Sequence, residues 1–322
     1  MGSLFLIKPL WLVCHNVGSN SMQQITTHLW FDKEALEAAE FYVSLFPNSK
    51  ITSTVALTGT PSGDCSLVAY ELAGMLFMAI NAGPAFVFNP SVSFLISCST
   101  REEVDSYWQQ LSPGGKVLMP LGEYPFSEWY GWLEDRYGLS WQVMFTGGSV
   151  RQLLTPVLMF VGEMCGRAEE AVNHYVSILL DAPGSLGIEE TALEVVEHYA
   201  TGTQPDREET LEFSRFLLLG KEYGAMDSAY EHQFAFNEAI SFLIPCNSQE
   251  EIDYLWEKLA ADPDSGQCGW LKDRFGFSWQ ISPVILQKML QSDDKNAVQR
   301  VTEAFLQMKK FDIAALVRAE EG

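Results

Sequence analysis

Two stretches of twelve residues decide how this chain is organised. Residues 131–142 read GWLEDRYGLSWQ and residues 269–280 read GWLKDRFGFSWQ, with nine of the twelve positions identical. Upstream of each lies a second match, FNPSVSFLISC at 88–98 and FNEAISFLIPC at 236–246, identical at seven of eleven positions. Because the matched stretches recur in the same order, the chain contains a tandem duplication.

The spacing of the matches shows that the two copies differ in length. EEVDSYWQQL (102–111) and EEIDYLWEKL (250–259) lie 148 residues apart, whereas the twelve-residue stretches lie 138 residues apart. The second copy therefore lacks ten residues from the loop before its last stretch. Each copy has about 120 residues, which is the size of a domain and too long for a solenoid repeat.

Hydrophobic periodicity predicts a β-α-β-β-β order at the start of the first copy. Apolar residues follow one helical face over 33–45, and strands are predicted at 25–31, 51–57, 66–72 and 75–80. The same order begins again with a strand at 92–98 and a helix capped by Ser99 or Thr100. The predicted fold class is α+β, with two tandem domains that are each a pair of βαβββ units.

Changes in composition along the chain set the expected boundaries. Residues 1–22 are expected to be an extension without regular structure, followed by a first domain at 23–148 and a second at 149–283. The boundary is placed at Gly147-Gly148-Ser149, where small residues follow the last strand of the first copy. Residues 284–322 form a tail, in which the spacing of Val298, Val301 and Phe305 predicts an amphipathic helix.

Composition indicates an acidic cytoplasmic protein. Asp and Glu number 42 against 20 Lys and Arg, for a net charge of −22, which disfavours binding to nucleic acid or to anionic membranes. The apolar stretch 4–13 is too short to span a bilayer. The six cysteines form no CxxC pair and are expected to be reduced thiols. Nothing in the sequence excludes a homodimer.

The paired units resemble the vicinal-oxygen-chelate superfamily, which includes glyoxalase I, the fosfomycin- and bleomycin-resistance proteins, methylmalonyl-CoA epimerase and the extradiol dioxygenases. The phrases LWFD (29–32), FYVSLFPNSKI (41–51) and MKKFDIAAL (308–316) are most similar to its PhnB-like branch. That branch is often described as a demethylubiquinone methyltransferase. However, no Gly-rich loop joins a strand to a helix as nucleotide-like cofactors require.

The resemblance implies that each domain curls its mixed sheet around a cavity, where strand residues bind a divalent metal. Carried over to this sequence, the family's ligand positions fall on Thr27, Ser91 and Gln142, and in the second copy near Pro156, Ala239 and Gln280. Most of these side chains are poor ligands for zinc or iron. We therefore predict no cofactor, with a divalent metal kept open as the alternative.

Two repeated glutamines are the main candidates for a ligand cavity. Gln142 and Gln280 either hold a polar ligand or are buried amides satisfied by the backbone, and the sequence leaves both interpretations open. Trp132 and Trp270 accompany them, as core aromatics or as walls of a pocket. His28 is a metal ligand only if the strand register shifts by one residue, because neighbouring strand residues face opposite sides of a sheet.

Three hypotheses for the function follow. The first is a small-molecule-binding protein of the PhnB-like branch, with one cavity per domain and no tightly held metal. The second is an isomerase or lyase of the glyoxalase type, acting with or without a metal. The third is a structural or interaction module without an open site. The fold alone does not choose among them, because one fold hosts many chemistries.

Overall fold

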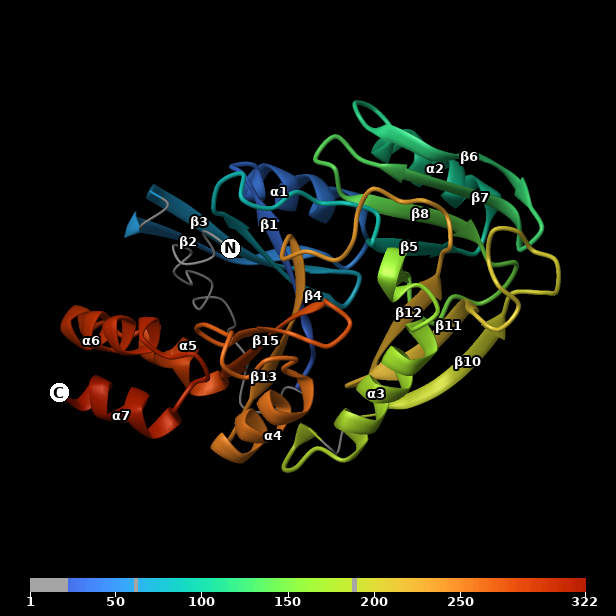
Figure 1. Cartoon of the computed structure of the whole chain (residues 1–322). Helices are drawn as coiled ribbons and strands as arrows, with labels where there is room; N and C mark the ends of the chain where they lie inside the picture. The colour runs from blue at the N-terminus through green and yellow to red at the C-terminus, as the bar shows by residue number, and fades with distance from the viewer. Residues whose placement is uncertain (1–22, 61–62, 187–189) are drawn as a thin grey trace.

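A computed structural model describes residues 23–60, 63–186 and 190–322, without the side chains of residues 56–65 (Figure 1). The expected N-terminal extension, 1–22, lies outside the described residues. No helix in the described part of the chain is long and apolar enough to cross a membrane.

The structure consists of four successive units of strands and a helix, followed by a helical tail. This order confirms the predicted α+β class and the paired units. Unit 1 contains β1 (Thr26–Phe31), α1 (Ala35–Leu45), β2 (Lys50–Thr60), β3 (Gly63–Leu72) and β4 (Met75–Asn81). Unit 2 contains β5 (Val92–Cys98), α2 (Arg101–Leu111), β6 (Lys116–Tyr124), β7 (Ser127–Glu134) and β8 (Ser140–Phe145).

The second sequence copy forms units 3 and 4 and leads into the tail. Unit 3 contains β9 (Leu154–Phe160), the short 3₁₀ helix η1 (Gly162–Met164), α3 (Ala168–Leu180), β10 (Ala192–His198), β11 (Leu211–Leu218) and β12 (Lys221–Asp227). Unit 4 contains β13 (Ile240–Cys246), α4 (Gln249–Leu259), β14 (Trp270–Lys272) and β15 (Ser278–Pro283). The tail contains α5 (Val284–Leu290), α6 (Lys295–Leu306) and α7 (Ile313–Glu321).

The helices of units 2 and 4 begin with equivalent side-chain caps. Thr100 forms a capping box with Glu103 at the start of α2, which agrees with the expected cap. Ser248 accepts a hydrogen bond from the backbone N–H of Glu251 at the start of α4. The repeated sequence thus sets the same local structure twice.

Each sheet combines one unit from each sequence copy. Sheet A has the strand order β14-β15-β13-β1-β4-β3-β2, so it joins units 1 and 4. Sheet B has the order β10-β11-β12-β9-β5-β8-β7-β6, so it joins units 2 and 3. We expected each copy, 23–148 and 149–283, to form its own sheet, and the strand pairing differs. The short connection 146–153 places β9 antiparallel beside β5, which leaves units 1 and 4 to pair through β1 and β13.

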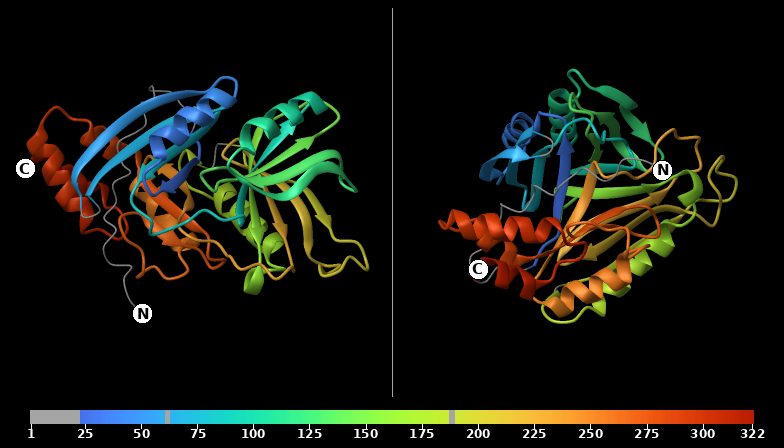
Figure 2. Two further views of the ribbon diagram at one scale, coloured as in Figure 1. Left: turned by 90° about the horizontal axis from the view of Figure 1, so that it is seen from above. Right: turned by 60° about the vertical axis from the view of Figure 1, so that its left-hand side comes forward.

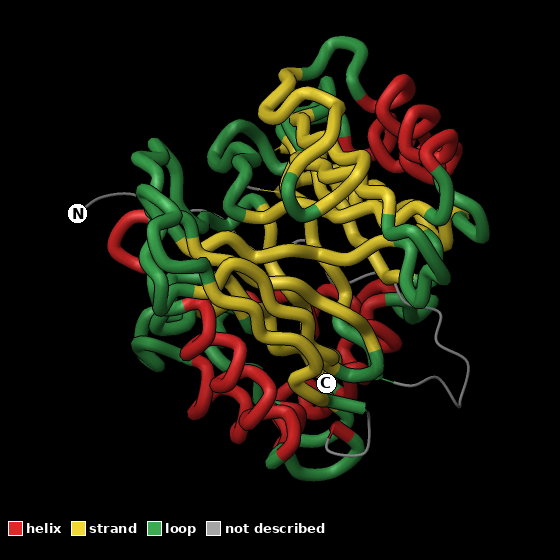
Figure 3. Tube along the Cα trace, turned by 90° about the vertical axis from the view of Figure 1, so that its right-hand side faces the viewer, coloured by secondary structure: helices red, strands yellow, loops and turns green. Residues whose placement is uncertain are grey.

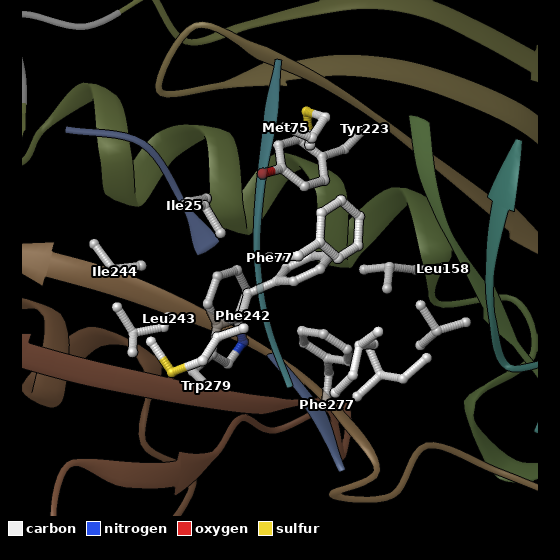
Figure 4. Packing of buried hydrophobic residues seen from close by; sticks show 14 of the residues in the cluster. Ile25, Met75, Phe77, Leu158, Tyr223, Phe242, Leu243, Ile244, Phe277 and Trp279 are labelled. Carbon is white, nitrogen blue, oxygen red and sulfur yellow. The ribbon is translucent and has the colours of Figure 1, made fainter. Parts of the chain in front are cut away.

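The helix-covered faces of the two sheets pack against each other and form the core. Phe77 of sheet A lies 5.5 Å from Phe94 of sheet B, and Tyr223 of sheet B lies 5.2 Å from Phe242 of sheet A, both between ring centroids. Figure 4 shows Phe77, Phe242 and Tyr223 meeting in this layer. The opposite faces of the two sheets, called here the outer faces, therefore point away from the shared core.

Two equivalent aspartates join the sheets within each sequence copy. The Asp135 carboxylate, between β7 and β8, accepts hydrogen bonds from Tyr42 Oη of α1 at 2.7 Å and from Trp141 Nε1 at 2.8 Å. Asp273 accepts the same bonds from Tyr175 Oη at 2.6 Å and Trp279 Nε1 at 2.8 Å. These bonds explain why a tyrosine near the end of α1 or α3 occurs together with the aspartate of the repeated twelve-residue stretch.

The tail covers the place where unit 4 has one strand fewer than unit 2. The ten residues missing from the second copy correspond to β6 and its turn, so β14 has no outer neighbour strand. Instead, the backbone N–H groups of Cys268 and Gly269 donate to the carbonyls of Met308 and Lys309, both at 2.7 Å. Gly269 has φ +84°, and a Cβ there would lie 2.5 Å from the Phe311 ring. The tail therefore needs glycine at this position.

The two outer faces differ in what lies over them. The tail helices α5, α6 and α7 lie beyond sheet A, on the side away from sheet B (Figures 1 and 2). Sheet B shows its strands directly to the viewer in Figure 3, without a helix in front. The duplicated units thus have unlike surroundings on their outer faces.

Candidate functional site

Strand register places His28 and Gln280 on the outer face of sheet A. His28 in β1 is the cross-strand partner of Ser241 in β13 and of Met78 in β4. Gln280 in β15 donates from Nε2 to Ser241 Oγ at 2.8 Å, so its side chain lies on the same face. Trp270 in β14 is the cross-strand partner of Gln280. His28, Ser241 and Gln280 therefore form one polar row across three neighbouring strands.

Several polar atoms of this face are buried without a hydrogen-bond partner. They include both ring nitrogens of His28 and Oε1 of Gln280, and both residues have 0% exposure. The hydroxyls of Ser278 and Ser53, which register places on the same face, also have no partner. A buried polar atom without a partner costs free energy, so a concentration of them indicates a place for a bound molecule or ordered water.

Burial lowers the pKa of His28 to about 3, because a protonated ring would have no solvent around it. The Trp270 ring meets the His28 ring edge-on, with centroids 5.5 Å apart and an interplanar angle of 87°. The imidazole is therefore neutral at physiological pH. It offers one hydrogen-bond donor and one acceptor.

This shift predicts a specific pH dependence of stability. Between about pH 3 and pH 6.5 the unfolded chain binds a proton at His28 that the folded chain does not. The free energy of unfolding should therefore fall as the pH drops below 6.5, by about 1.4 kcal/mol per pH unit from this residue. Denaturant unfolding at several pH values measures this slope in the parent and in His28→Gln, and the slope should be smaller in the variant.

Ser241→Ala is the matched control for this experiment, because it alters the same face without removing an ionisable group. Its pH slope should equal that of the parent. An equal slope in His28→Gln would contradict the burial of a neutral His28.

The equivalent residues of sheet B satisfy one another. Gln142 in β8 donates from Nε2 to Ser93 Oγ at 2.7 Å, as Gln280 does to Ser241. The Tyr130 hydroxyl donates to Gln142 Oε1 at 2.7 Å, so both ends of this amide are bonded. Trp132 Nε1 donates to Ser140 Oγ at 2.8 Å. Among the described side chains, no buried polar atom of the sheet B outer face lacks a partner.

One substitution between the copies accounts for part of this difference. The residue before the repeated Gly-Trp-Leu is Tyr130 in the first copy and Cys268 in the second. The Cys268 thiol points to the tail, 3.4 Å from the Phe305 carbonyl oxygen. Gln280 therefore has no equivalent of the Tyr130 hydroxyl.

The structure separates the other predicted site residues from the glutamines. Thr27 pairs with Phe242 and Phe77, so it faces the core, on the opposite side of the sheet from His28. Ser91 lies before β5, where its backbone N–H donates to Asn89 Oδ1. The strand positions beside the glutamines are His28 and Ser241 in sheet A, and Val157 and Ser93 in sheet B. Thr27 and Ser91 therefore lie one and two residues before the strand positions that neighbour the glutamines.

Sequence reasoning missed Ser93, Ser241 and Tyr130. The two serines occupy the same place in the repeated SFL of both β5 and β13, which was an available signal. The exchange of Tyr130 for Cys268 beside an otherwise repeated stretch was a second signal. Both depend on knowing which face of each strand is the outer one.

The outer face of sheet A does not fit a divalent zinc or iron site. It offers one imidazole and one free amide oxygen, and no described carboxylate or thiolate joins them. Within the described residues, no group of three or more His, Cys, Asp or Glu side chains could hold a metal ion. Zinc and iron sites take three or four such ligands with supporting hydrogen bonds.

Metal analysis tests this directly. Protein purified without chelators should contain zinc, iron, nickel and manganese well below one ion per chain, because the ligand set is incomplete. A chelator should leave the melting temperature unchanged. One equivalent of metal that is lost in His28→Gln would contradict this prediction, whereas His198→Gln, at an exposed histidine, is the control.

The connection between β9 and α3, which contains two glycines in the left-handed region, does not fit a nucleotide-like cofactor. It contains Gly162 and Gly166, both with positive φ. Asp227 occupies the N-terminus of α3, because its carboxylate accepts from the backbone N–H groups of Gly166 at 2.6 Å and Ala168 at 3.2 Å. Phosphate groups bind such a helix end only when its N–H groups are available.

Both copies match one protein family, and solved structures are similar to this chain. Residues 23–144 and 152–282 both match the family described as 3-demethylubiquinone-9 3-methyltransferase. A PhnB protein from Bacillus cereus with the same description is 39% identical, over 38% of this chain and 100% of that chain, with a TM-score of 0.35. Glyoxalase I from Zea mays is 10% identical, over 85% of this chain and 97% of that chain, with a TM-score of 0.50, a likeness of fold. A search of curated proteins finds no match.

Proposed function

The chain belongs to the 3-demethylubiquinone-9 3-methyltransferase family, which includes PhnB-like proteins, and we propose that it binds a small molecule on the outer face of sheet A. The observation that carries this proposal is the set of partnerless polar atoms on His28 and Gln280. Leaving such atoms unbonded costs roughly 1–3 kcal/mol each, and a polar ligand would remove that cost. The description of the family as methyltransferases is not extended to this chain.

The contrast with sheet B supports placing the ligand in sheet A. Both sheets have a glutamine bonded to a serine on the outer face, but Tyr130 completes the hydrogen bonds only in sheet B. We therefore propose one ligand site per chain, where the sequence suggested one per domain. The site is built from units 1 and 4 of a single chain, so no second chain is needed to complete it.

A ligand screen with a residue-specific readout tests the proposal. The full chain is exposed to a panel of small alcohols, amides, carboxylates and phosphates, and the ring ¹⁵N signals of His28 are followed by NMR. A molecule bound at the site should shift these signals and raise the melting temperature by mass action. If no member of a broad panel changes the His28 signals, the proposed site is wrong.

Replacing the two glutamines should separate the site from its equivalent. Gln280→Met should weaken a bound panel molecule by about 1–3 kcal/mol, because it removes the free amide oxygen. Gln142→Met should leave the affinity unchanged, since both ends of Gln142 are bonded within the protein. Calorimetric titration of both variants gives the comparison, and equal losses of affinity would argue against a single site in sheet A.

We also propose a cytoplasmic location. Cys98 and Cys246 are buried free thiols, which is the form expected in a reducing compartment.

A further inference from the structure

In sheet B, a tyrosine of the protein itself provides the hydrogen-bond donor that Gln280 lacks in sheet A. The Tyr130 side chain is 3% exposed, and its hydroxyl donates to Gln142 Oε1. Gln142 Nε2 donates to Ser93, and the atom of Gln142 that meets the Tyr130 hydroxyl is Oε1, which can only accept. Gln280 is committed to Ser241 in the same way, and its Oε1 is left as an acceptor. The ligand group at Gln280 must therefore be a donor.

The charges on the outer face of sheet A favour an uncharged ligand. The described charged side chains that strand register places on this face, Lys50, Glu71 and Lys272, all take part in ion pairs. Lys50 lies 3.5 Å from Glu71, and Lys272 lies 2.9 Å from Glu238. The remaining groups, including His28, are uncharged. A buried ionised ligand would meet no opposite charge that is not already in one of these ion pairs, and it would lose its hydration.

We infer, on the basis of the proposed function, that the ligand of the outer face of sheet A is an uncharged hydroxyl compound of the phenol type. Its O–H donates to Gln280 Oε1, in the place that the Tyr130 hydroxyl takes at Gln142. A second polar group of the ligand bonds the His28 ring, which has both a donor and an acceptor to offer. The Trp270 ring, which contacts the His28 ring, then lies beside the aromatic ring of the ligand.

Three matched probes test this inference on the full chain. p-Cresol is the tyrosine side chain without its backbone, toluene has the same shape without the hydroxyl, and 4-methylbenzoate is an anion of similar shape. p-Cresol should bind once per chain, shift the His28 ring signals, and bind about tenfold or more tightly than toluene, as one buried hydrogen bond provides. 4-Methylbenzoate should leave the His28 signals unchanged.

Variants assign the binding to Gln280. Gln280→Met should reduce p-cresol binding to the level of toluene, and Gln142→Met should retain it. Tyr130→Ala removes the built-in phenol, so this variant should bind a second p-cresol in sheet B and regain melting temperature from it, as other engineered cavities take up the group that was removed. If Tyr130→Ala does not fold, the two glutamine variants still decide the question.

The outcomes separate the inference from the proposed function. If 4-methylbenzoate shifts the His28 signals and p-cresol does not, the ligand class is wrong and the site stands. Equal binding of p-cresol and toluene, or p-cresol binding that survives in Gln280→Met, would also overturn the hydroxyl inference. If neither the three probes nor the broader panel changes the His28 ring signals, both the ligand class and the proposed function are wrong.

Discussion

Deletion of residues 284–322 should leave a chain that does not fold stably. Six large apolar side chains of this tail are at most 3% exposed: Leu286, Met289, Val301, Phe305, Phe311 and Leu316. Burying each one contributes roughly 1.5–3 kcal/mol, so together they contribute roughly 9–18 kcal/mol, which is comparable with the typical stability of a whole domain, about 5–15 kcal/mol. Circular dichroism melting and size-exclusion chromatography of the truncated chain should show aggregation or loss of the cooperative transition.

Point substitutions localise the effect to the edge of β14. Phe311→Ala should cost about 3–5 kcal/mol, because the ring is fully buried against Gly269. Lys310→Ala is the matched control at the neighbouring position, where an ion pair with Asp253 is partly exposed, and it should cost less than about 1 kcal/mol. A truncated chain as stable and as soluble as the parent would show that the tail is not part of the fold.

The repeated sequence predicted most of the local structure but not the pairing of the sheets. The match of 131–142 with 269–280 identified the units, and periodicity identified their strands and helices. A repeat carries no information on which unit edges bond, because either arrangement buries the same apolar faces. The pairing of β5 with β9 depends on the length and direction of the connection 146–153, which hydrophobic periodicity does not predict.

The candidate site was predicted only in part, because a strand's two faces differ by a single residue. Gln142 and Gln280 were identified, and both lie on the outer faces of their sheets. Thr27 was preferred to His28 by counting back from the helix, and the observed register places Thr27 on the core face and His28 on the outer face. The free state of Gln280 could not be predicted, since it follows from where the Cys268 side chain points.

Removing the Asp135 carboxylate should strongly destabilise the protein. Its two oxygens accept four hydrogen bonds, from the side chains of Tyr42 and Trp141 and from the backbone N–H groups of Tyr137 and Leu139. Asp135→Leu leaves four donors without an acceptor, and each buried one costs about 1–3 kcal/mol. Denaturant unfolding should show a loss of roughly 4 kcal/mol or more.

Smaller changes to the same cluster should give graded losses. Burial raises the pKa of Asp135, and the hydrogen bonds from Tyr42 and Trp141 oppose that shift, so these donors stabilise a carboxylate held away from water. Tyr42→Phe removes one donor and should cost about 1.5–3 kcal/mol, the usual contribution of a hydrogen bond to a charged group. Tyr175→Phe should cost the same, because Tyr175 bonds Asp273 in the second copy as Tyr42 bonds Asp135 in the first.

Tyr137→Phe is the control, since the Tyr137 hydroxyl makes only exposed contacts with Arg136 and Glu37. It should change stability by no more than about 0.5 kcal/mol. The double variant Tyr42→Phe with Tyr175→Phe should lose the sum of the two single changes, because the two clusters share no residue. If both single variants are as stable as the parent, the aspartates do not join the sheets in the way the hydrogen bonds indicate.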